Sequence, residues 1–371
     1  MSEDGDRDRL RPRCRVLHVI TRLDRGGSAE NTLLTMAHLD PDQYEVTLAV
    51  GPSQGRMSPT LDLARDRGVR IVHIPHLIRA VHPWYDLRAL GLLWRLSRGF
   101  DLVHTHTSKA GIVGRLAARL ARAPHVIHTP HAHVFYGYYS AVVTRMFLVL
   151  ERIAARWCDR IVALTEADLE DHVRFNVAPG AQFIVIHSGV DLRALGRLTA
   201  IKGQSDLIRA VAQFDRPVWL LFVGDGEEQE ALHELAEDVG ISERTVFAGW
   251  RSDTGDLLRT MDLFAFPSLN EGLGKALVEA MYLRRPIVAT RVGAVPQLME
   301  DKVHGLLVPA RPPSALTQAL QMLCDEPKLA LGLAEAAHER SKAFGVDSMI
   351  EMIETMYQDL LSRSTPELAL S

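Results

Sequence analysis

The chain has 371 residues, of which 47% are hydrophobic and 24% charged, a composition typical of a soluble globular protein of about two domains. It contains no run of about 18 apolar residues, so the sequence predicts no membrane-spanning helix. The net charge of -4 divides into +5 over residues 1–190 and -9 over the rest, which favours an anionic partner for the first half, such as a phosphorylated substrate or a membrane surface. Two ordinary surfaces that differ in charge explain the same numbers.

The cysteines and the first residues bear on the compartment. Cys14, Cys158 and Cys324 lack metal-type spacing and are typical of thiols in a reducing environment. The stretch MSEDGDRDRL is charged, unlike the apolar core of a secretory signal. We therefore expect a cytoplasmic protein, and we expect no nucleic-acid partner.

Short apolar, β-branched segments alternate with helical patterns along the first half of the chain. The expected strands are 15–20, 45–50, 69–74, 101–106, 125–130 and 160–165. Strand and helix at this spacing predict a parallel sheet with helices on both faces.

The alternation starts again after the segment IHSGVDLRALGRL. The expected strands of the second half are 219–224, 245–250, 263–268, 286–290 and 305–309. We expect Rossmann-like domains over 1–190 and 191–345, followed by a last helix and a tail over 346–371. Ligands of doubly wound sheets bind at the carboxyl ends of the strands, which predicts a site in a cleft between the domains.

Two glycine motifs follow expected strands. Gly26 and Gly27 stand at the start of a helix, where free N–H groups bind anions, although a plain tight turn explains them equally well. Gly224 and Gly226 lack the third glycine and the distant acid of a dinucleotide fingerprint, which disfavours an oxidoreductase.

Two cations stand five residues apart in GRLTAIKG. In a loop, Arg197 and Lys202 can converge on one diphosphate, the arginine as a fork and the lysine as a point charge. Taken alone, the same pair is equally consistent with two surface cations.

Histidines gather at the ends of two expected strands. His104 and His106 share one strand face, and His131 and His133 follow the next strand in the same way. Such a cluster can bind zinc, but the nearby sequence offers no cysteine and few carboxylates. We predict no metal, and we expect cleft histidines that hydrogen-bond a sugar or a phosphate.

The stretch SLNEGLGKALVEAM places two acids eight residues apart. A helix that starts near Gly272 leaves the N–H groups of Gly272, Leu273, Gly274 and Lys275 as an anion site. In such a helix Glu271 and Glu279 are separated by about 80° and up to ~12 Å, so they reach hydroxyls on opposite sides of a bound diphosphate. Glu279 is flanked by apolar residues and requires a partner; a salt bridge is the alternative to a ligand.

Together these motifs resemble a retaining glycosyltransferase of the family-4 type. Glu271 to Glu279 matches the E-x7-E signature, and G-R-x4-K-G, the double glycine and HTPHAH occur in the family's order. The resemblance implies a GT-B fold, in which two doubly wound domains face each other across a cleft. It also implies that the last helix returns to the first domain.

The resemblance also implies roles for individual residues. Arg197 and Lys202 would neutralise the donor diphosphate, with help from the backbone of Gly26 and Gly27 and of Gly272 to Lys275. Glu279 would bind the ribose, while Glu271 and His131 would contact the transferred sugar. The cations would replace a divalent metal, so the resemblance implies no cofactor and a nucleoside-diphosphate sugar as donor, UDP-type rather than GDP-type.

One departure from the family pattern concerns the second domain. Only Leu192 to Leu195 stand where the family has a connector and a strand, so we expect the first strand of this domain to be shortened or absent. That loss would unsettle the loop that aims Arg197 and Lys202, and would expose a neighbouring strand edge.

Three functions therefore compete. The first is transfer of a hexose or N-acetylhexosamine to a glycan or lipid-linked acceptor, in cell-envelope or exopolysaccharide assembly. The second is a non-catalytic binding protein with the same fold, and the third is a sugar-nucleotide epimerase. Residues 79–98 are arginine-rich and apolar, which is typical either of contact with anionic lipid or of a packed helix with exposed arginines.

Overall fold

The protein is described here by a computed structural model, which covers residues 13–24, 27–53, 55, 57–58, 60–131, 141–189, 199–251, 253–272 and 274–363. The chain forms two compact units. Unit 1 comprises Met1–Gly189 with Met349–Ser371, and unit 2 comprises Val190–Ser348. In the described part of the chain, no helix combines the length and the apolar character needed to cross a bilayer.

Unit 1 contains one parallel sheet of seven strands in the order β3-β2-β1-β4-β5-β6-β7. The strands are β1 Cys14–Ile20, β2 Tyr44–Val50, β3 Arg70–His73, β4 Leu102–His106, β5 His125–Thr129, β6 Arg160–Ala163 and β7 Phe183–Val185. All six expected strands are confirmed. The order that runs outward from β1 in both directions is that of a doubly wound fold.

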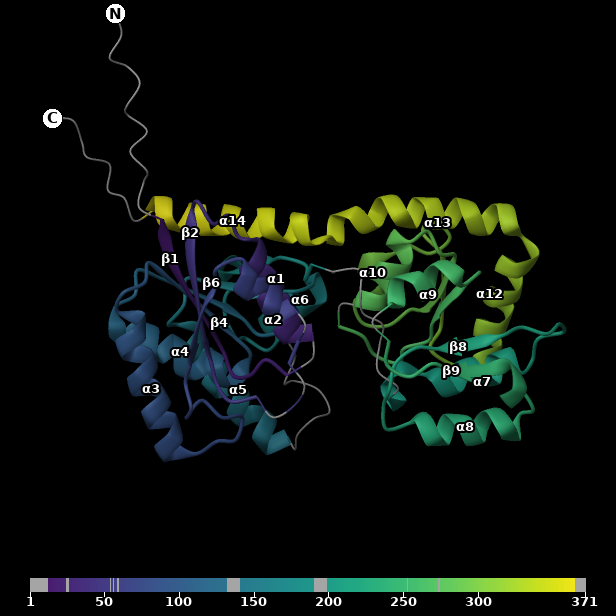
Figure 1. Ribbon diagram of the computed structural model, residues 1–371, viewed down its shortest axis with the longest axis horizontal. Coiled ribbons are helices and arrows are strands. Elements are labelled where there is room, and N and C mark those ends of the chain that lie inside the picture. The colour runs from purple at the N-terminus through teal and green to yellow at the C-terminus, as the bar shows by residue number, and fades with distance from the viewer. Residues whose placement is uncertain are drawn as a thin grey trace, which may run out of the picture. The chain divides into compact units, whose positions relative to one another are not determined.

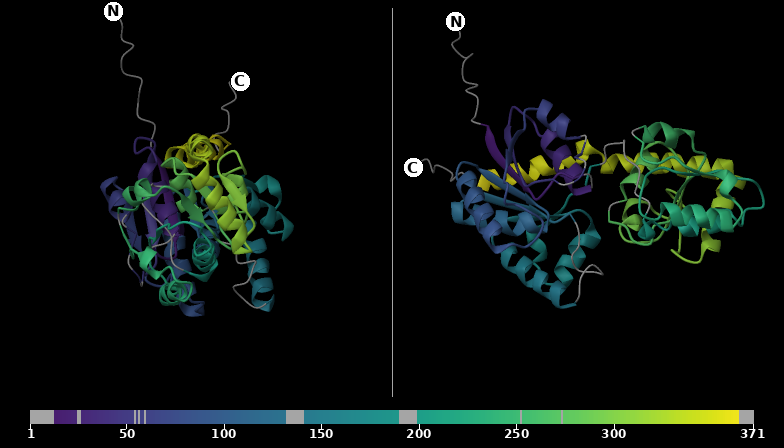
Figure 2. Two further views of the ribbon diagram at one scale, coloured as in Figure 1. Left: turned by 90° about the vertical axis from the view of Figure 1, so that its right-hand side faces the viewer. Right: turned by 60° about the horizontal axis from the view of Figure 1, so that its bottom comes forward.

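Helices cover both faces of this sheet (Figure 1). They are α1 Gly27–His38, α2 Thr60–Asp66, α3 Pro83–Ser97, α4 Ser108–Ala121, α5 Ala141–Ala155, α6 Glu166–Arg174 and α14 Val346–Arg363, with the short 3₁₀ turn η1 Gly180–Gln182. On one face, Val19 and Val103 share a core with Ala110 and Ala117 of α4. On the other, α14 packs against β1 and β4 (Figure 2), so the last helix belongs to unit 1 as the family resemblance implies.

Unit 2 begins, in its described part, with the 3₁₀ turn η2 Ala200–Lys202. Its strands are β8 Leu220–Phe222, β9 Thr245–Phe247, β10 Phe264–Phe266, β11 Ile287–Thr290 and β12 Leu306–Val308, all of them expected from the sequence. Its helices are α7 Gln204–Val211, α8 Gln229–Asp238, α9 Thr254–Thr260, α10 Lys275–Tyr282, α11 Val295–Leu298, α12 Pro313–Asp325 and α13 Pro327–Ser341, with 3₁₀ turns η3 Ser242–Arg244 and η4 Lys342–Phe344.

The strands of unit 2 form two separate parallel sheets, β8-β9 and β10-β11-β12. In the doubly wound order 3-2-1-4-5-6, the first strand lies between the second and the fourth. A domain that lacks this first strand leaves strands 2 and 3 as one group and strands 4 to 6 as another, which is the division observed. From Thr199 onward no described strand precedes β8, as the short connector predicts; residues 190–198 lie outside the described part.

One hydrophobic core nevertheless joins the two sheets of unit 2. Phe222 of β8 and Val308 of β12 belong to the same buried cluster, together with Leu207 of α7 and Leu316 of α12. In the described part of unit 2, buried side chains of α7 and α12 therefore connect the two groups of strands.

Candidate active site

The loop that follows β10 brings two of the predicted residues together in unit 2. The Nζ atom of Lys202 lies 2.5 Å from Oε2 of Glu271, and Ser268 Oγ donates a hydrogen bond to the same oxygen at 3.2 Å. The side chain of Glu271 is 12% exposed and that of Lys202 27%. A partly buried pair of this kind interacts more strongly than one in bulk water.

The backbone around η2 fixes the position of Lys202. Gly203 has a φ of +67°, and a Cβ atom there would lie 2.1 Å from the carbonyl oxygen of Pro267. The amide of Leu269 donates to the carbonyl of Ile201 at 2.8 Å. These contacts hold η2 against the residues that follow β10 and so help to fix the position of Lys202.

A second glycine fixes the main chain of Glu271. Gly293, in the turn between β11 and α11, has a φ of +51°, and a Cβ atom there would lie 2.0 Å from the carbonyl oxygen of Glu271. The amide of Ala294 donates to that same oxygen at 3.2 Å. Only glycine permits this approach, so the turn and the acidic loop form one rigid unit.

Helix α10 begins at Lys275, so the predicted start near Gly272 is wrong by three residues. Gly274 is its N-cap and has the left-handed conformation, with φ +69° and ψ +51°, which a helical residue does not adopt. The amides of Leu277 and Val278 already bond the carbonyl of Gly274. An anion at this helix start would therefore meet the amides of Lys275 and Ala276.

Because Glu271 lies in the loop, the separation of 80° and ~12 Å predicted for two acids on one helix does not apply. Gly272 is exposed, with open space where a Cβ would stand. Glu279 lies inside α10 and is 1% exposed, as its apolar neighbours predict. The assignment of Glu279 to a ribose remains a prediction.

Three of the other predicted site residues lie outside the described part of the chain: Gly26, Arg197 and Leu273. The same holds for His133. Gly27 is the first residue of α1 and is exposed, with nothing within 4 Å of a Cβ placed on it. The helix start predicted after the first strand is therefore confirmed at this position.

In unit 1, three buried histidines meet on one face of the sheet. His104 and His106 share a face of β4, as predicted, with ring centroids 4.4 Å apart. His18 of β1, which lies opposite His104 in the strand register, has its ring 5.1 Å from each of them. The sequence analysis missed His18, although a histidine inside the apolar run RVLHVI is the signal that identifies it.

The histidine cluster has the dimensions of a metal site. One nitrogen from each of His18, His104 and His106 lies within 4.8 Å of the others. Nitrogens of all three rings, however, lie at hydrogen-bond distance from each other or from hydroxyl groups. The absence of a metal remains a prediction.

Strained backbone marks the carboxyl ends of β4 and β5. Thr107 has φ +62° and ψ +161°, and His131 has φ +65°. Both conformations are unfavourable for residues with a Cβ atom and cost about 1–3 kcal/mol each. Residues held in this way cluster at functional sites, and His131 lies at the edge where the sequence places the ligand.

Burial keeps the histidine cluster neutral. It lowers the pKa of His18 from 6.5 to about 3, and it lowers the pKa values of His104 and His106 well below 6.5, with a further contribution from neighbouring histidines. The folded protein therefore takes up fewer protons than the unfolded chain between pH 6.5 and the lowered pKa values. Above pH 6.5 these histidines therefore do not lower the free energy of unfolding, and below pH 6.5 the free energy of unfolding decreases as the pH falls.

We expect each neutral histidine of the cluster to reduce the free energy of unfolding by up to about 1.4 kcal/mol per pH unit below 6.5. Urea unfolding at pH 7.0, 6.0 and 5.0 measures the slope. His18→Gln should flatten it more than the control His73→Gln, which removes a histidine at an exposed position of β3. Equal slopes for both variants and the wild type would contradict the assignment of neutral charge to His18.

Comparison with known proteins places each unit in a family. Residues 26–189 match the family described as "Glycosyl transferase 4-like domain", and residues 190–326 match "Glycosyl transferases group 1". The chain is a glycosyltransferase of the family-4 type. This enzyme is 26% identical over 357 residues, covering 87% of this chain and 91% of the relative, to the UDP-Gal:alpha-D-GlcNAc-diphosphoundecaprenol alpha-1,3-galactosyltransferase of Escherichia coli.

Other similarities agree with the fold. Over 146 residues, 39% of this chain and 43% of the relative, the glycosyltransferase is 37% identical to LpsE of Rhizobium meliloti, a lipopolysaccharide core biosynthesis glycosyltransferase. The crystal structure of Anabaena Alr3699/HepE in complex with UDP superimposes with a TM-score of 0.80 at 21% identity, covering 93% of this chain and all of that one. The fold is GT-B.

Proposed function

We propose that this glycosyltransferase moves a hexose or N-acetylhexosamine from a UDP-sugar to a glycan or lipid-linked acceptor, with retention at the anomeric carbon, in cell-envelope or exopolysaccharide assembly. The observation that carries the proposal is the contact between Lys202 and Glu271 beside the start of α10. It joins, in one place, a cation for the departing diphosphate and a carboxylate for sugar hydroxyls.

The geometry around Glu271 favours binding over nucleophilic attack. Its Oε2 atom already receives an ammonium and a hydroxyl group, so its charge is compensated. In the proposed reaction the bond from the anomeric carbon to the diphosphate breaks while the acceptor oxygen bonds to the same face. The departing phosphate oxygen takes the acceptor's proton, and Lys202 stabilises the charge that develops on the diphosphate.

The names of similar proteins support the donor and the acceptor. The Escherichia coli relative is named for UDP-Gal and for a diphosphoundecaprenol-linked acceptor. HepE has crystal structures with UDP, with UDP and glucose, and with UDP-glucose. A UDP-sugar donor and a lipid-linked acceptor are therefore the first candidates for this chain.

The non-catalytic alternative depends on the expected loss of the first strand, which would unsettle the loop that carries Lys202. Contacts with Pro267 and Leu269 position that loop instead, so this argument against activity is weakened. Calorimetric titration with UDP and GDP, followed by product analysis with UDP-hexoses and a polyprenyl-diphosphate-linked sugar, tests the proposal. Binding of UDP with transfer only in the presence of acceptor supports it; binding without transfer to any acceptor favours the non-catalytic alternative.

We also propose that the enzyme contacts anionic membrane through helix α5 of unit 1. Four large apolar side chains of α5 are exposed at helical spacing: Met146, Val149, Leu150 and Ile153. Arg145, Arg152 and Arg156 flank this stripe and are exposed as well. An apolar stripe beside a row of cations is typical of a helix that lies in the membrane interface.

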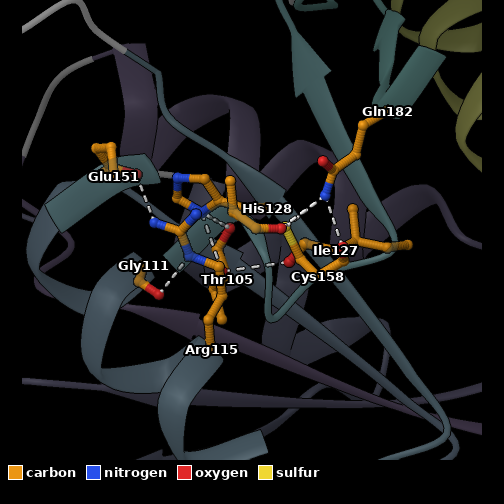
Figure 3. Close-up of polar contacts among 9 residues, drawn as sticks. Thr105, Gly111, Arg115, Ile127, His128, Glu151, Cys158 and Gln182 are labelled. Carbon is orange, nitrogen blue, oxygen red and sulfur yellow. Dashed lines mark hydrogen bonds and ion pairs between the residues drawn. The ribbon is translucent and has the colours of Figure 1, made fainter. Parts of the chain in front are cut away.

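The orientation of α5 is fixed from the inside (Figure 3). Glu151 is the one acidic residue between Ala141 and Arg156, and its carboxylate pairs with the fully buried Arg115 of α4 at 2.6 Å. On an ideal helix Met146, Val149 and Ile153 lie about 140–160° around the axis from Glu151, and Leu150 lies about 100° from it. Because Glu151 faces Arg115 on the inner side, the apolar stripe faces outward beside arginines only.

We expect the double substitution Met146→Glu and Ile153→Glu to reduce binding to vesicles of anionic lipid at least about tenfold, because each side chain loses roughly 1.5–3 kcal/mol of burial and gains repulsion from the lipid charge. Vesicle co-sedimentation at low and high salt measures it. Leu331→Glu, on an exposed apolar position of α13, is the control. If the α5 variant and the control bind alike, α5 is not the contact surface.

A further inference from the structure

A continuous chain of hydrogen-bond contacts connects His131 to helix α14. His131 Nε2 lies 2.9 Å from His106 Nδ1, and His106 Nε2 lies 2.9 Å from His18 Nδ1. His18 Nε2 is 3.4 Å from the hydroxyl of Tyr357, which lies 2.7 Å from His104 Nδ1. This hydrogen-bonded chain ends at Thr129, whose Oγ1 lies 2.8 Å from His104 Nε2.

The members of this chain constrain one another's protons. A neutral imidazole has one N–H donor and one acceptor nitrogen, so each ring must donate at one end and accept at the other. His18, His104 and His106 are buried and neutral at pH 7. All bonds of the chain therefore run in the same direction, and only two arrangements of protons are possible.

Thr32 fixes the direction at the His131 end. Its hydroxyl donates to the carbonyl oxygen of Ser28 at 2.8 Å, so its oxygen can only accept from His131 Nε2, which lies 3.4 Å away. This contact favours the tautomer of His131 with the proton on Nε2.

Tyr357 and Thr129 fit the same direction at the other end. In that direction His104 donates from Nε2 to Thr129 Oγ1 at 2.8 Å. Tyr357 donates to His104 Nδ1 across the 2.7 Å contact. Its oxygen then accepts from His18 Nε2, His18 accepts from His106, and His106 accepts from His131.

We propose that Tyr357 is a positioning residue, which acts through His18 and His106 to hold His131 in the Nε2–H tautomer. The Nδ1 atom of His131 is then an acceptor, suited to a hydroxyl group of the transferred sugar. The contact with the sugar rests on the proposed function; the control of the tautomer does not. The left-handed backbone of His131 fixes the ring's position, and the hydrogen-bonded chain fixes its protons.

The test uses the full-length protein with ¹⁵N-labelled histidine and compares wild type with Tyr357→Phe. Long-range ¹H–¹⁵N spectra distinguish protonated from unprotonated ring nitrogens, and the signals lost in His131→Gln identify His131. We expect a protonated Nε2 in the wild type and a mixture of both tautomers in Tyr357→Phe. The variant should also lower kcat by about tenfold, the effect of one neutral hydrogen bond, without changing KM for the donor.

Tyr44→Phe is the matched control, because the Tyr44 ring lies edge-on to Tyr357 at 5.8 Å but its hydroxyl is not part of the chain. It should leave the His131 signals and kcat unchanged. A wild-type His131 protonated on Nδ1, a Tyr357→Phe spectrum identical to wild type, or one equivalent of metal bound by the three histidines would each overturn the inference. If no donor supports transfer, the proposed function fails, while the spectra still decide the tautomer.

Discussion

Lys202→Ala is expected to lower kcat/KM for the donor by about a hundred- to a thousandfold, the usual cost of removing one preorganised group that stabilises developing charge. The proposed reaction places negative charge on the departing diphosphate, and Lys202 is held at the end of β10 by backbone contacts that do not involve its side chain. Truncation therefore removes the charge without moving the loop. Initial rates of UDP release in the presence of acceptor measure the effect.

The contact between Lys202 and Glu271 offers a second explanation for a loss of kcat/KM in Lys202→Ala, and the experiment must distinguish it from the loss of leaving-group stabilisation. Lys202→Ala leaves the partly buried carboxylate of Glu271 without its ammonium partner, which disturbs the site even if Lys202 never touches the donor. A double-mutant cycle resolves this. If Lys202 stabilises the leaving group, Lys202→Ala still lowers kcat/KM in a Glu271→Gln background. If Lys202 acts only on Glu271, Lys202→Ala causes no further loss of kcat/KM in that background. Lys328→Ala, on the exposed surface of α13, should behave as wild type.

The sequence predicts the fold well because strands buried in parallel sheets are continuous apolar runs. Runs such as VLHVI in β1 and IVAT in β11 contrast clearly with the helical patterns around them. Strand β7, Phe183–Val185, was missed because three residues next to the segment between the domains are too few to show a hydrophobic period. The division of the described strands of unit 2 into two sheets agrees with the short connector, which leaves little chain for a first strand.

The start of α10 was not predictable to the residue, because it depends on a backbone angle. Gly272 and Gly274 look equivalent in the sequence, yet only Gly274 has the left-handed conformation that ends the loop. The close approach of Gly293 to Glu271 joins segments 22 residues apart, and no periodicity reports such contacts. The identities of the two acids were therefore accessible from sequence, and their geometry was not.

The histidine chain shows the same limit. Alternation along β4 places His104 and His106 on one face, because side chains two apart in a strand point the same way. The contribution of His18 requires the register of β1 against β4, and that of Tyr357 requires the packing of a helix more than 250 residues further along the chain. Local patterns carry no information about either.

Arg115→Met is expected to reduce the free energy of unfolding of unit 1 by about 3–5 kcal/mol, because it leaves the carboxylate of Glu151 buried without its partner. Arg115 is fully buried; its Nε donates to the carbonyl of Gly111 at 2.9 Å and its Nη2 to Glu151 at 2.6 Å (Figure 3). Urea unfolding followed by hydrogen exchange resolved by peptide measures the loss in α4 and α5. Arg259→Ala, which breaks an exposed pair with Asp256, should cost no more than about 1 kcal/mol.

The double variant Arg115→Met with Glu151→Leu separates stability from orientation. Replacing both charges by apolar groups of similar size removes the desolvation cost of each, so its stability should return to that of the wild type or exceed it. A leucine at position 151 still directs this face of α5 inward, and the stripe of Met146, Val149, Leu150 and Ile153 should remain exposed and keep its affinity for anionic vesicles. If the double variant is stable but no longer binds vesicles, the ion pair itself aligns α5 for the membrane; if it remains as unstable as Arg115→Met, packing around Arg115 rather than the unpaired charge sets the cost.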